Sequence, residues 1–224
     1  MVKIINLETA TTNCSVSVSV DGELISVKEE NTPNYSHAEQ LHIFIEEALK
    51  EASLSFSDMD AIAVSKGPGS YTGLRIGVSA AKGLCFSLDL PLISVPTLES
   101  MANQIQVGLD EVIIPVLDAR RMEVYSCVFD DNHKEIRTTK AEIIDKNSFK
   151  EYLDFKKVHI IGSGAEKCEE ILEYSNFQFY KEAFPSAKEM ARIAHKKFEV
   201  SDFEDVAYFE PYYLKDFILQ TKKA

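Results

Sequence analysis

Residues 67–77 are the stretch that decides the fold: Gly67-Pro68-Gly69-Ser70-Tyr71-Thr72-Gly73-Leu74-Arg75-Ile76-Gly77. The stretch follows an apolar, β-branched segment at residues 61–64 and leads into helix-compatible sequence. Its first two glycines and the proline between them predict a tight turn, and Ser70 or Thr72 can cap a helix that starts there. The segment therefore predicts a strand, a tight turn and a helix in succession.

The turn has two interpretations. The free N–H groups at the start of a helix, together with the helix dipole, can hold an anion. On this interpretation Gly67, Gly69 and Ser70 are the candidate cofactor-binding residues. On the other, the glycines only let the strand and the helix pack closely. A P-loop is excluded, because no Lys-Ser or Lys-Thr pair follows the second glycine.

The sequence before the turn predicts three strands and a helix. Strands are expected at residues 2–7, 16–20 and 24–27, with Asp21-Gly22 as a hairpin turn. A helix is expected at residues 37–52, where apolar residues recur at helical spacing. That apolar stripe consists of Leu41, Phe44, Ile45, Ala48, Leu49 and Ala52. Ile43 lies off the stripe, which leaves apolar surface outside the core of the monomer.

The pattern then continues and starts again. The helix from the glycine turn is expected to end near residue 88, before a strand at 90–95 and a helix at 98–105. Strands at 112–117, 123–129, 135–138 and 158–161 follow, with helices at 148–155, from 165 to 172, and after a cap at Ser186. Two copies of a β-meander followed by α/β units predict an α/β protein with two ribonuclease-H-like halves. We expect residues 1–105 to form the first half and 106–224 the second, whose last segment can pack back on the first.

Small residues mark two faces of the helix that follows the turn. Gly73, Gly77 and Ala81 share one face at four-residue spacing, and Ile76, Ala80 and Gly83 lie on a neighbouring face. Glycine inside a helix costs about 1 kcal/mol relative to alanine. The glycines therefore predict the close approach of another backbone, either in the protein's own sheet or in the helix of a partner. Small residues on two faces favour both neighbours.

Composition limits the possible functions. The net charge of −12 disfavours binding to nucleic acid by this chain alone, so an RNA would be held by a more basic partner. The four cysteines form no close pair, and Cys14, Cys85 and Cys127 lie in apolar stretches that predict buried thiols. The longest uncharged stretch, residues 9–20, is too short to cross a membrane. We expect a cytoplasmic protein without a signal peptide.

Several separated segments resemble one family, TsaB (also called YeaZ). The two most specific are residues 67–77 and Asp118-Ala119-Arg120-Arg121-Met122-Glu123-Val124-Tyr125. Three others support them: Gly162-Ser163-Gly164-Ala165, Pro185-Ser186-Ala187 and Pro211-Tyr212-Tyr213-Leu214-Lys215. The matches follow the family's order along the whole chain.

The resemblance implies an actin/sugar-kinase-like (ASKHA) fold and a non-catalytic dimerisation subunit. Such a subunit supports TsaD, which transfers a threonylcarbamoyl group from its adenylate onto the tRNA adenosine beside the anticodon. TsaD carries two metal-binding histidines where this chain has Thr97 and Met101. The resemblance further implies a heterodimer with TsaD that the ATPase TsaE joins, and a homodimer when the chain is alone. The chain itself would need no cofactor, although a nucleotide can bind at the joint interface.

The predicted interface with TsaD comes from two helices. Leu41 and Ile45 are expected to contribute from residues 37–52, and Gly73, Ile76, Gly77 and Ala80 from residues 73–88. On this view Gly77→Leu or Ala80→Arg abolishes partner binding while the monomer still folds. The alternative function is a small-molecule kinase or ATPase of the same fold, for which Glu8, Gly162 and Gly164 are the hints. A metallopeptidase is a further alternative, against which the missing histidine pair argues.

Overall fold

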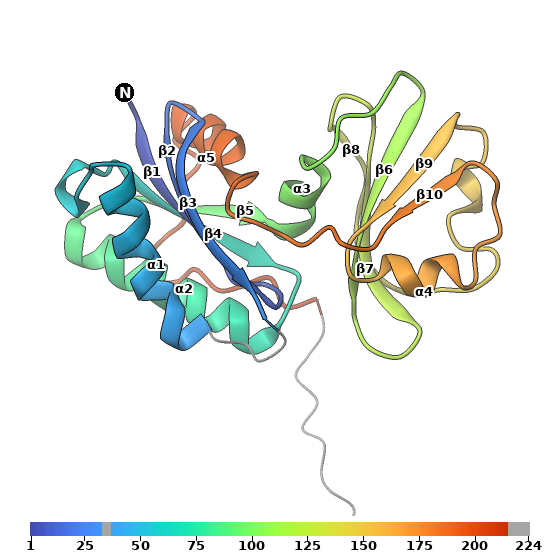
Figure 1. The fold of residues 1–224 in the computed structure, drawn as a ribbon, viewed down its shortest axis with the longest axis horizontal. Helices are drawn as coiled ribbons and strands as arrows, with labels where there is room; N and C mark the ends of the chain where they lie inside the picture. The colour runs from blue at the N-terminus through green and yellow to red at the C-terminus, as the bar shows by residue number, and fades with distance from the viewer. Residues whose placement is uncertain (33–36, 215–224) are drawn as a thin grey trace, which may run out of the picture.

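Two five-stranded sheets built on the same plan organise the chain (Figure 1). The computed structural model describes residues 1–32 and 37–214. The first sheet contains β1 (Lys3–Glu8), β2 (Asn13–Val20), β3 (Glu23–Asn31), β4 (Ala61–Gly67) and β5 (Leu92–Pro96), in the order β3-β2-β1-β4-β5. The second contains β6 (Glu111–Asp118), β7 (Glu123–Phe129), β8 (Glu135–Ile143), β9 (Lys157–Ile161) and β10 (Phe177–Tyr180), in the order β10-β9-β6-β7-β8.

The pairing of the strands confirms the predicted duplication. In the first sheet β1 pairs antiparallel with β2 and parallel with β4, and β4 pairs parallel with β5. In the second, β6 pairs antiparallel with β7 and parallel with β9. Each sheet is therefore an antiparallel meander extended by parallel strands, the ribonuclease-H-like plan. The fold class is α/β and actin/sugar-kinase-like, as the sequence predicted.

The helices cover the sheets unequally. They are α1 (His37–Glu51), α2 (Tyr71–Leu88), α3 (Thr97–Ala102), α4 (Ala165–Glu169) and α5 (Met190–Glu199), with short 3-10 turns η1 (Phe56–Asp58) and η2 (Lys150–Tyr152). In Figure 1, α1 and α2 cover one face of the first sheet, α5 lies on its other face, and α3 lies between the two sheets. Among the described residues, none of the helices has both the length and the apolar character needed to cross a membrane.

The last helix belongs with the first sheet. Met190, Ile193 and Ala194 of α5 are buried in one apolar cluster with Ile4 and Ile93 of that sheet. The loop before α5 is held to β2 as well, since Asn13 Nδ2 donates to the carbonyl oxygen of Pro185 at 2.9 Å and Ser17 Oγ donates to that of Ala187 at 2.8 Å. We propose that the two halves of the chain divide at residue 105, which falls between the last strand of the first sheet and the first strand of the second.

Several predicted elements of the second half were wrong in extent. The expected helix at residues 148–155 is only the 3-10 turn η2, because Phe149 adopts a left-handed conformation with φ 62° and buries its ring in the core of the second half. The helix expected to reach residue 172 ends at Glu169, and α5 starts at Met190, after Ser186. Strand β10 was not predicted. The three cysteines predicted to be buried are buried, and so is Cys168.

Candidate partner-binding groove

The glycine turn is held by the turn between β1 and β2. The N–H of Ser70 donates to the carbonyl oxygen of Ala10 at 2.6 Å, and Ser70 Oγ caps α2 by accepting from the N–H of Gly73 at 3.3 Å. A Cβ atom added to Gly69 would lie 2.4 Å from the Ala10 carbonyl oxygen. Close packing therefore explains Gly69, and capping of α2 explains Ser70. Nucleotide binding at this turn stays a prediction.

One face of α2 packs against the protein's own β1–β2 turn. Thr9 Oγ1 donates to the carbonyl oxygen of Gly73 at 2.8 Å. A Cβ atom would lie 2.1 Å from the Thr9 carbonyl oxygen at Gly73 and 2.3 Å from Thr9 Oγ1 at Gly77. A larger residue would require the backbone to move at Gly73 and the Thr9 side chain to move at Gly77. This face accounts for the close approach that Gly73 and Gly77 predict, and the neighbour is the chain's own turn.

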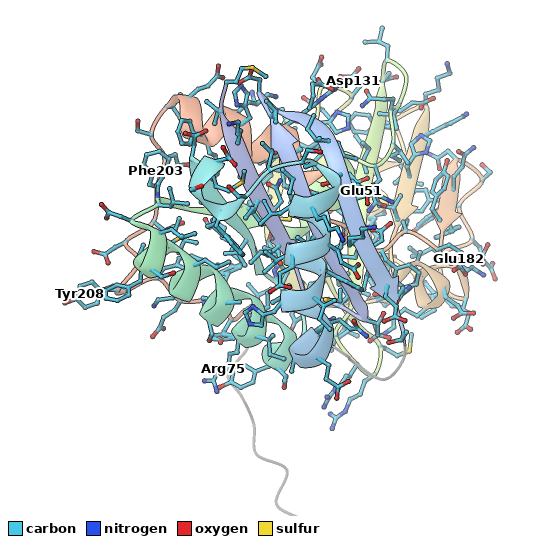
Figure 2. The ribbon with its side chains drawn as sticks, turned by 60° about the vertical axis from the view of Figure 1, so that its left-hand side comes forward. Glu51, Arg75, Asp131, Glu182, Phe203 and Tyr208 are labelled. Carbon is cyan, nitrogen blue, oxygen red and sulfur yellow. The ribbon has the colours of Figure 1, made fainter. Side chains whose placement is uncertain are left out.

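A groove of about 700 Å³ runs along the outer faces of α1 and α2. It is lined by Ala38 and His42 of α1 and by Tyr71, Thr72, Arg75, Ile76, Ser79, Ala80, Gly83 and Leu84 of α2. Figure 2 shows the two helices side by side, with Arg75 at one end of α2. The surface is built mostly of small and apolar side chains, which permit a partner helix to approach closely.

The structure corrects four of the six predicted interface residues. Leu41 and Ile45 are 0% and 1% exposed and lie in the core under α1. Gly73 and Gly77 are buried against Thr9. None of the four can contact a partner, because the apolar stripe of α1 and the glycine face of α2 already pack on the first sheet. Ile76 and Ala80, the other two, line the groove.

The same geometry corrects the expected effect of Gly77→Leu. A leucine at this position would meet Thr9 inside the monomer, so the variant would disturb folding rather than a partner contact. The appropriate position is Gly83. It lines the groove, and a Cβ atom added there meets nothing within 4 Å.

An exposed aromatic residue extends the groove. Phe86 of α2, one turn beyond Gly83, is 87% exposed. Its ring adds apolar surface next to the groove, and burial of that surface against a partner would be favourable. The sequence does not predict this role for Phe86, because periodicity alone does not distinguish a partner-facing aromatic residue from one facing the core.

A C-terminal segment, residues 203–213, borders the groove, and we call it the strap. Lys82 Nζ of α2 donates to the carbonyl oxygens of Ala207 and Phe209 at 3.0 and 3.1 Å. At the far end, the N–H of Tyr212 donates to the carbonyl oxygen of Lys66 at 2.7 Å, and the Tyr213 ring packs on Tyr71 with centroids 4.9 Å apart. The strap thus joins the end of the described chain to the glycine turn. Lys215, part of the last resembling motif, lies outside the described residues.

Glu8 lies at the end of β1 and is completely buried. Its Oε1 accepts from the N–H of Ala10 at 2.6 Å and from Ser65 Oγ at 2.8 Å. Burial raises the pKa of Glu8 to about 7, although these two hydrogen bonds oppose the rise. The carboxyl group therefore braces the β1–β2 turn that supports α2.

The motifs of the second half form a structural network. Lys167 Nζ donates to Asp118 Oδ1 at 2.9 Å and to the carbonyl oxygen of Arg121 at 2.7 Å, which fixes the turn between β6 and β7. A Cβ atom added to Gly162 would lie 2.3 Å from the carbonyl oxygen of Val116. Close packing explains this glycine, which is one of the hints for a kinase in the sequence.

A model of the family described as TsaD, tRNA N6-adenosine threonylcarbamoyltransferase, matches residues 33–222. The chain belongs to the TsaD family. The Escherichia coli protein named tRNA threonylcarbamoyladenosine biosynthesis protein TsaB is 29% identical over 225 residues, covering 96% of this chain and 95% of that one. A Haemophilus influenzae protein of the same name is 35% identical over 123 residues, and that match spans 54% of this chain and about half, 51%, of the relative.

A solved structure has the same fold as this TsaD-family chain. YeaZ from Pseudomonas aeruginosa matches with a TM-score of 0.78 at 23% identity, covering 96% of this chain and 100% of that one. Together these relatives place the chain with the TsaB/YeaZ members of the family, which confirms the resemblance seen in the motifs.

At two positions this member of the TsaD family lacks the metal-binding histidines expected in a catalytic TsaD. Thr97 and Met101, which stand where the resemblance expects metal-binding histidines, are both completely buried. Met101 packs in an apolar cluster with Leu98 and Ile113. Within residues 1–32 and 37–214, no three His, Cys, Asp or Glu side chains are grouped so that they could hold a metal ion.

Proposed function

We propose that this chain is a non-catalytic subunit in tRNA threonylcarbamoyladenosine biosynthesis and that it binds a TsaD-type transferase through the α1–α2 groove. The observation that carries the proposal is the groove itself, an open surface with small and apolar lining next to the exposed ring of Phe86. Exposed apolar surface of this kind is characteristic of protein-binding sites. The names of the E. coli and H. influenzae relatives supply the pathway.

The partner, rather than this chain, would carry out the transfer. Thr97 and Met101 offer no ligand set for a hard divalent cation, since a thioether is soft and a lone hydroxyl is weak. The metal and the reacting groups would then belong to the transferase. This chain would keep the transferase in its active arrangement, and no cofactor is required for that role. A nucleotide at the joint interface stays part of the proposal.

The charge of the chain suggests how RNA enters the complex. A net charge of −12 repels a phosphate backbone, so tRNA would be bound through the transferase. The ATPase TsaE would join the pair, and the whole complex would act in the cytoplasm. Without its partner, the chain can cover the groove by forming a homodimer.

Light-scattering chromatography tests the proposal. The unmodified chain is run alone and then mixed with the TsaD-type transferase of the same organism. The variants Gly83→Lys and Gly83→Ala are each mixed with the same transferase in place of the unmodified chain. We expect a one-to-one complex with the unmodified chain, none with Gly83→Lys, and a normal complex with the control Gly83→Ala. Threonylcarbamoyl transfer to tRNA should need both proteins. A normal complex with Gly83→Lys would overturn the groove assignment, and transfer by this chain alone would overturn the non-catalytic role.

A further inference from the structure

Arg75 is held in a fixed position at the edge of the groove. Its guanidinium carbon lies 4.1 Å from the centroid of the Tyr71 ring, and its Nε donates to the hydroxyl of Tyr213 at 3.3 Å. The two rings pack on each other and come from distant parts of the chain, one from α2 and one from the strap. Because a stacked and hydrogen-bonded arginine has already lost most of its rotamer freedom, it binds a partner with less entropic cost than a free one.

The rest of the guanidinium group is available to a partner. Within residues 1–32 and 37–214, Nη1 and Nη2 of Arg75 form no hydrogen bond or ion pair. Glu210 of the strap acts on Arg75 through its charge without forming an ion pair with it. Nη1 and Nη2 together form the planar fork that matches a carboxylate.

The groove offers no acid of its own. None of its ten lining residues is an aspartate or a glutamate, although the chain contains 36 of them. The exposed acids of α1, such as Glu39 and Glu46, lie outside the lining. A partner that docks in the groove must therefore supply the carboxylate itself, or leave a guanidinium group partly desolvated and unpaired.

The need for a carboxylate distinguishes the two possible occupants of the groove, a second copy of the chain and another protein. A two-fold homodimer places the same patch of both subunits face to face. Each Arg75 would then meet a lining without acids. A desolvated charge without a counter-charge opposes association, whereas a complementary charge favours it.

We propose that Arg75 determines which partner the groove accepts, by pairing with a carboxylate on an apolar helix of another protein and by disfavouring self-association. The inference rests on the proposed function, since it names the chemistry of the partner that the groove binds. Tyr71 and Tyr213 act as positioning residues, because they hold the guanidinium group and leave its fork open.

The test compares two associations in the same variants. Arg75→Gln keeps a polar side chain of similar reach without the charge, and Arg75→Lys keeps the charge without the fork. Arg192→Gln is the control for net charge, because its ion pair with Glu23 is on the surface and more than 70% exposed on both sides. Heterodimer affinity for the TsaD-type transferase is measured by calorimetry at about 0.05 M and about 0.5 M NaCl, and homodimer affinity by sedimentation.

We expect Arg75→Gln to weaken the heterodimer by about tenfold or more and to flatten its salt dependence, while the homodimer becomes stronger. Arg75→Lys should recover part of the heterodimer affinity, and Arg192→Gln should change neither association. Equal heterodimer affinity and salt dependence for Arg75→Gln and the unmodified chain would overturn the inference. So would a weaker homodimer in Arg75→Gln.

The outcome is separable from failure of the proposed function. If Gly83→Lys prevents the heterodimer while Arg75→Gln leaves it unchanged, the groove binds the transferase and only the role of Arg75 is wrong. If Gly83→Lys also binds normally, the groove is not the docking surface and both statements fail. The Arg75 variants should melt close to the unmodified chain, since Arg75 is exposed in the monomer. Gly83→Lys should melt no lower, since Gly83 is also exposed and lysine favours a helix more than glycine does.

Discussion

The side-chain hydroxyl of Thr9 donates a hydrogen bond of 2.8 Å to the main-chain carbonyl oxygen of Gly73. This contact joins the turn after the first strand to the first turn of α2. It exists because Gly73 has no side chain, so that the backbone of the helix can approach the backbone of the turn. The position of the groove depends on this contact, since α2 supplies eight of the ten lining residues.

Alanine should have opposite effects at two glycines of α2. At Gly73 the added Cβ would lie 2.1 Å from the Thr9 carbonyl oxygen, so Gly73→Ala should lower the free energy of unfolding by about 2 kcal/mol. At Gly83 the space is open, and Gly83→Ala should raise that free energy by about 0.5–1 kcal/mol through helix propensity. Urea unfolding of both variants measures the difference. Equal effects of the two substitutions would contradict the close packing of Gly73 on Thr9.

Stability should fall as the pH rises through the titration of Glu8. Burial raises the pKa of Glu8 from 4.5 to about 7, so between these values the folded protein keeps a proton that the unfolded chain has released. The stabilisation is complete below pH 4.5 and is lost as the pH passes 7. At about 1.4 kcal/mol for each pH unit between the two pKa values, the loss amounts to about 3 kcal/mol. Urea unfolding at a series of pH values between 5 and 8 measures it.

Glu8→Gln is the matched variant for this prediction. It keeps an oxygen that can accept from Ala10 and Ser65, and it cannot ionise. The variant should be more stable than the unmodified chain at pH 8, with a smaller dependence on pH. Some dependence should remain, because burial also raises the pKa of Glu189 to about 7. Parallel pH curves for the two proteins would show that Glu8 titrates normally in the folded state.

Removal of the Lys82 ammonium group should release the strap. Lys82→Met keeps the apolar stem and loses both hydrogen bonds to Ala207 and Phe209. Because Tyr208 between them is 84% exposed, chymotrypsin should cut after it several times faster in the variant. Lys50→Met, which changes an exposed lysine of α1, is the control. An unchanged rate of cleavage would mean that other contacts hold the strap.

Loss of the helix cap should weaken the turn without blocking the groove. Ser70→Ala removes the oxygen that accepts from the N–H of Gly73 and should cost about 1 kcal/mol of stability. For a chain of this size that corresponds to a decrease of about 2–4 °C in the melting temperature. Complex formation with the transferase should persist. Calorimetric melting measures the first effect, and a complex lost at a temperature where the variant is folded would implicate Ser70 in binding.

Local sequence patterns predicted most of the fold, because the strands and helices of both halves follow from the spacing of their apolar residues. Alternation and helical spacing placed both meanders and both long helices of the first half, and the glycine turn connected β4 to α2. Strand β10 was not predicted, because the four residues Phe177–Tyr180 are too few to indicate a strand by alternation alone. The sequence allowed the last segment to pack back on the first half, but it did not predict the contacts of the strap. Its contact between Arg75 and Tyr213 joins positions 138 residues apart, and no local pattern encodes such a pair.

The sequence and the structure point to the same two helices for the candidate groove, but they differ in the residues that line it. The sequence indicated α1 and α2, but it assigned Leu41 and Ile45 to a partner although their stripe is the one that anchors α1 to the core. An amphipathic helix uses its main apolar stripe for its own sheet first. The residues left for a partner include small ones at the edge of the stripe. Ala80 is among the predicted contacts, whereas Gly83 is not, because apolar periodicity gives a glycine no weight.

The packing of α5 on the first sheet also sets the order in which the two halves can be completed. A ribosome makes the chain from its N-terminus, so Ile4, Ala63 and Ile93 stay without their cover until residues 190–199 leave the exit tunnel. All five strands of the second sheet have been synthesised by then, since β10 ends at Tyr180. Domains generally fold in the order of their synthesis. Here the half that is made first is the half that is finished last.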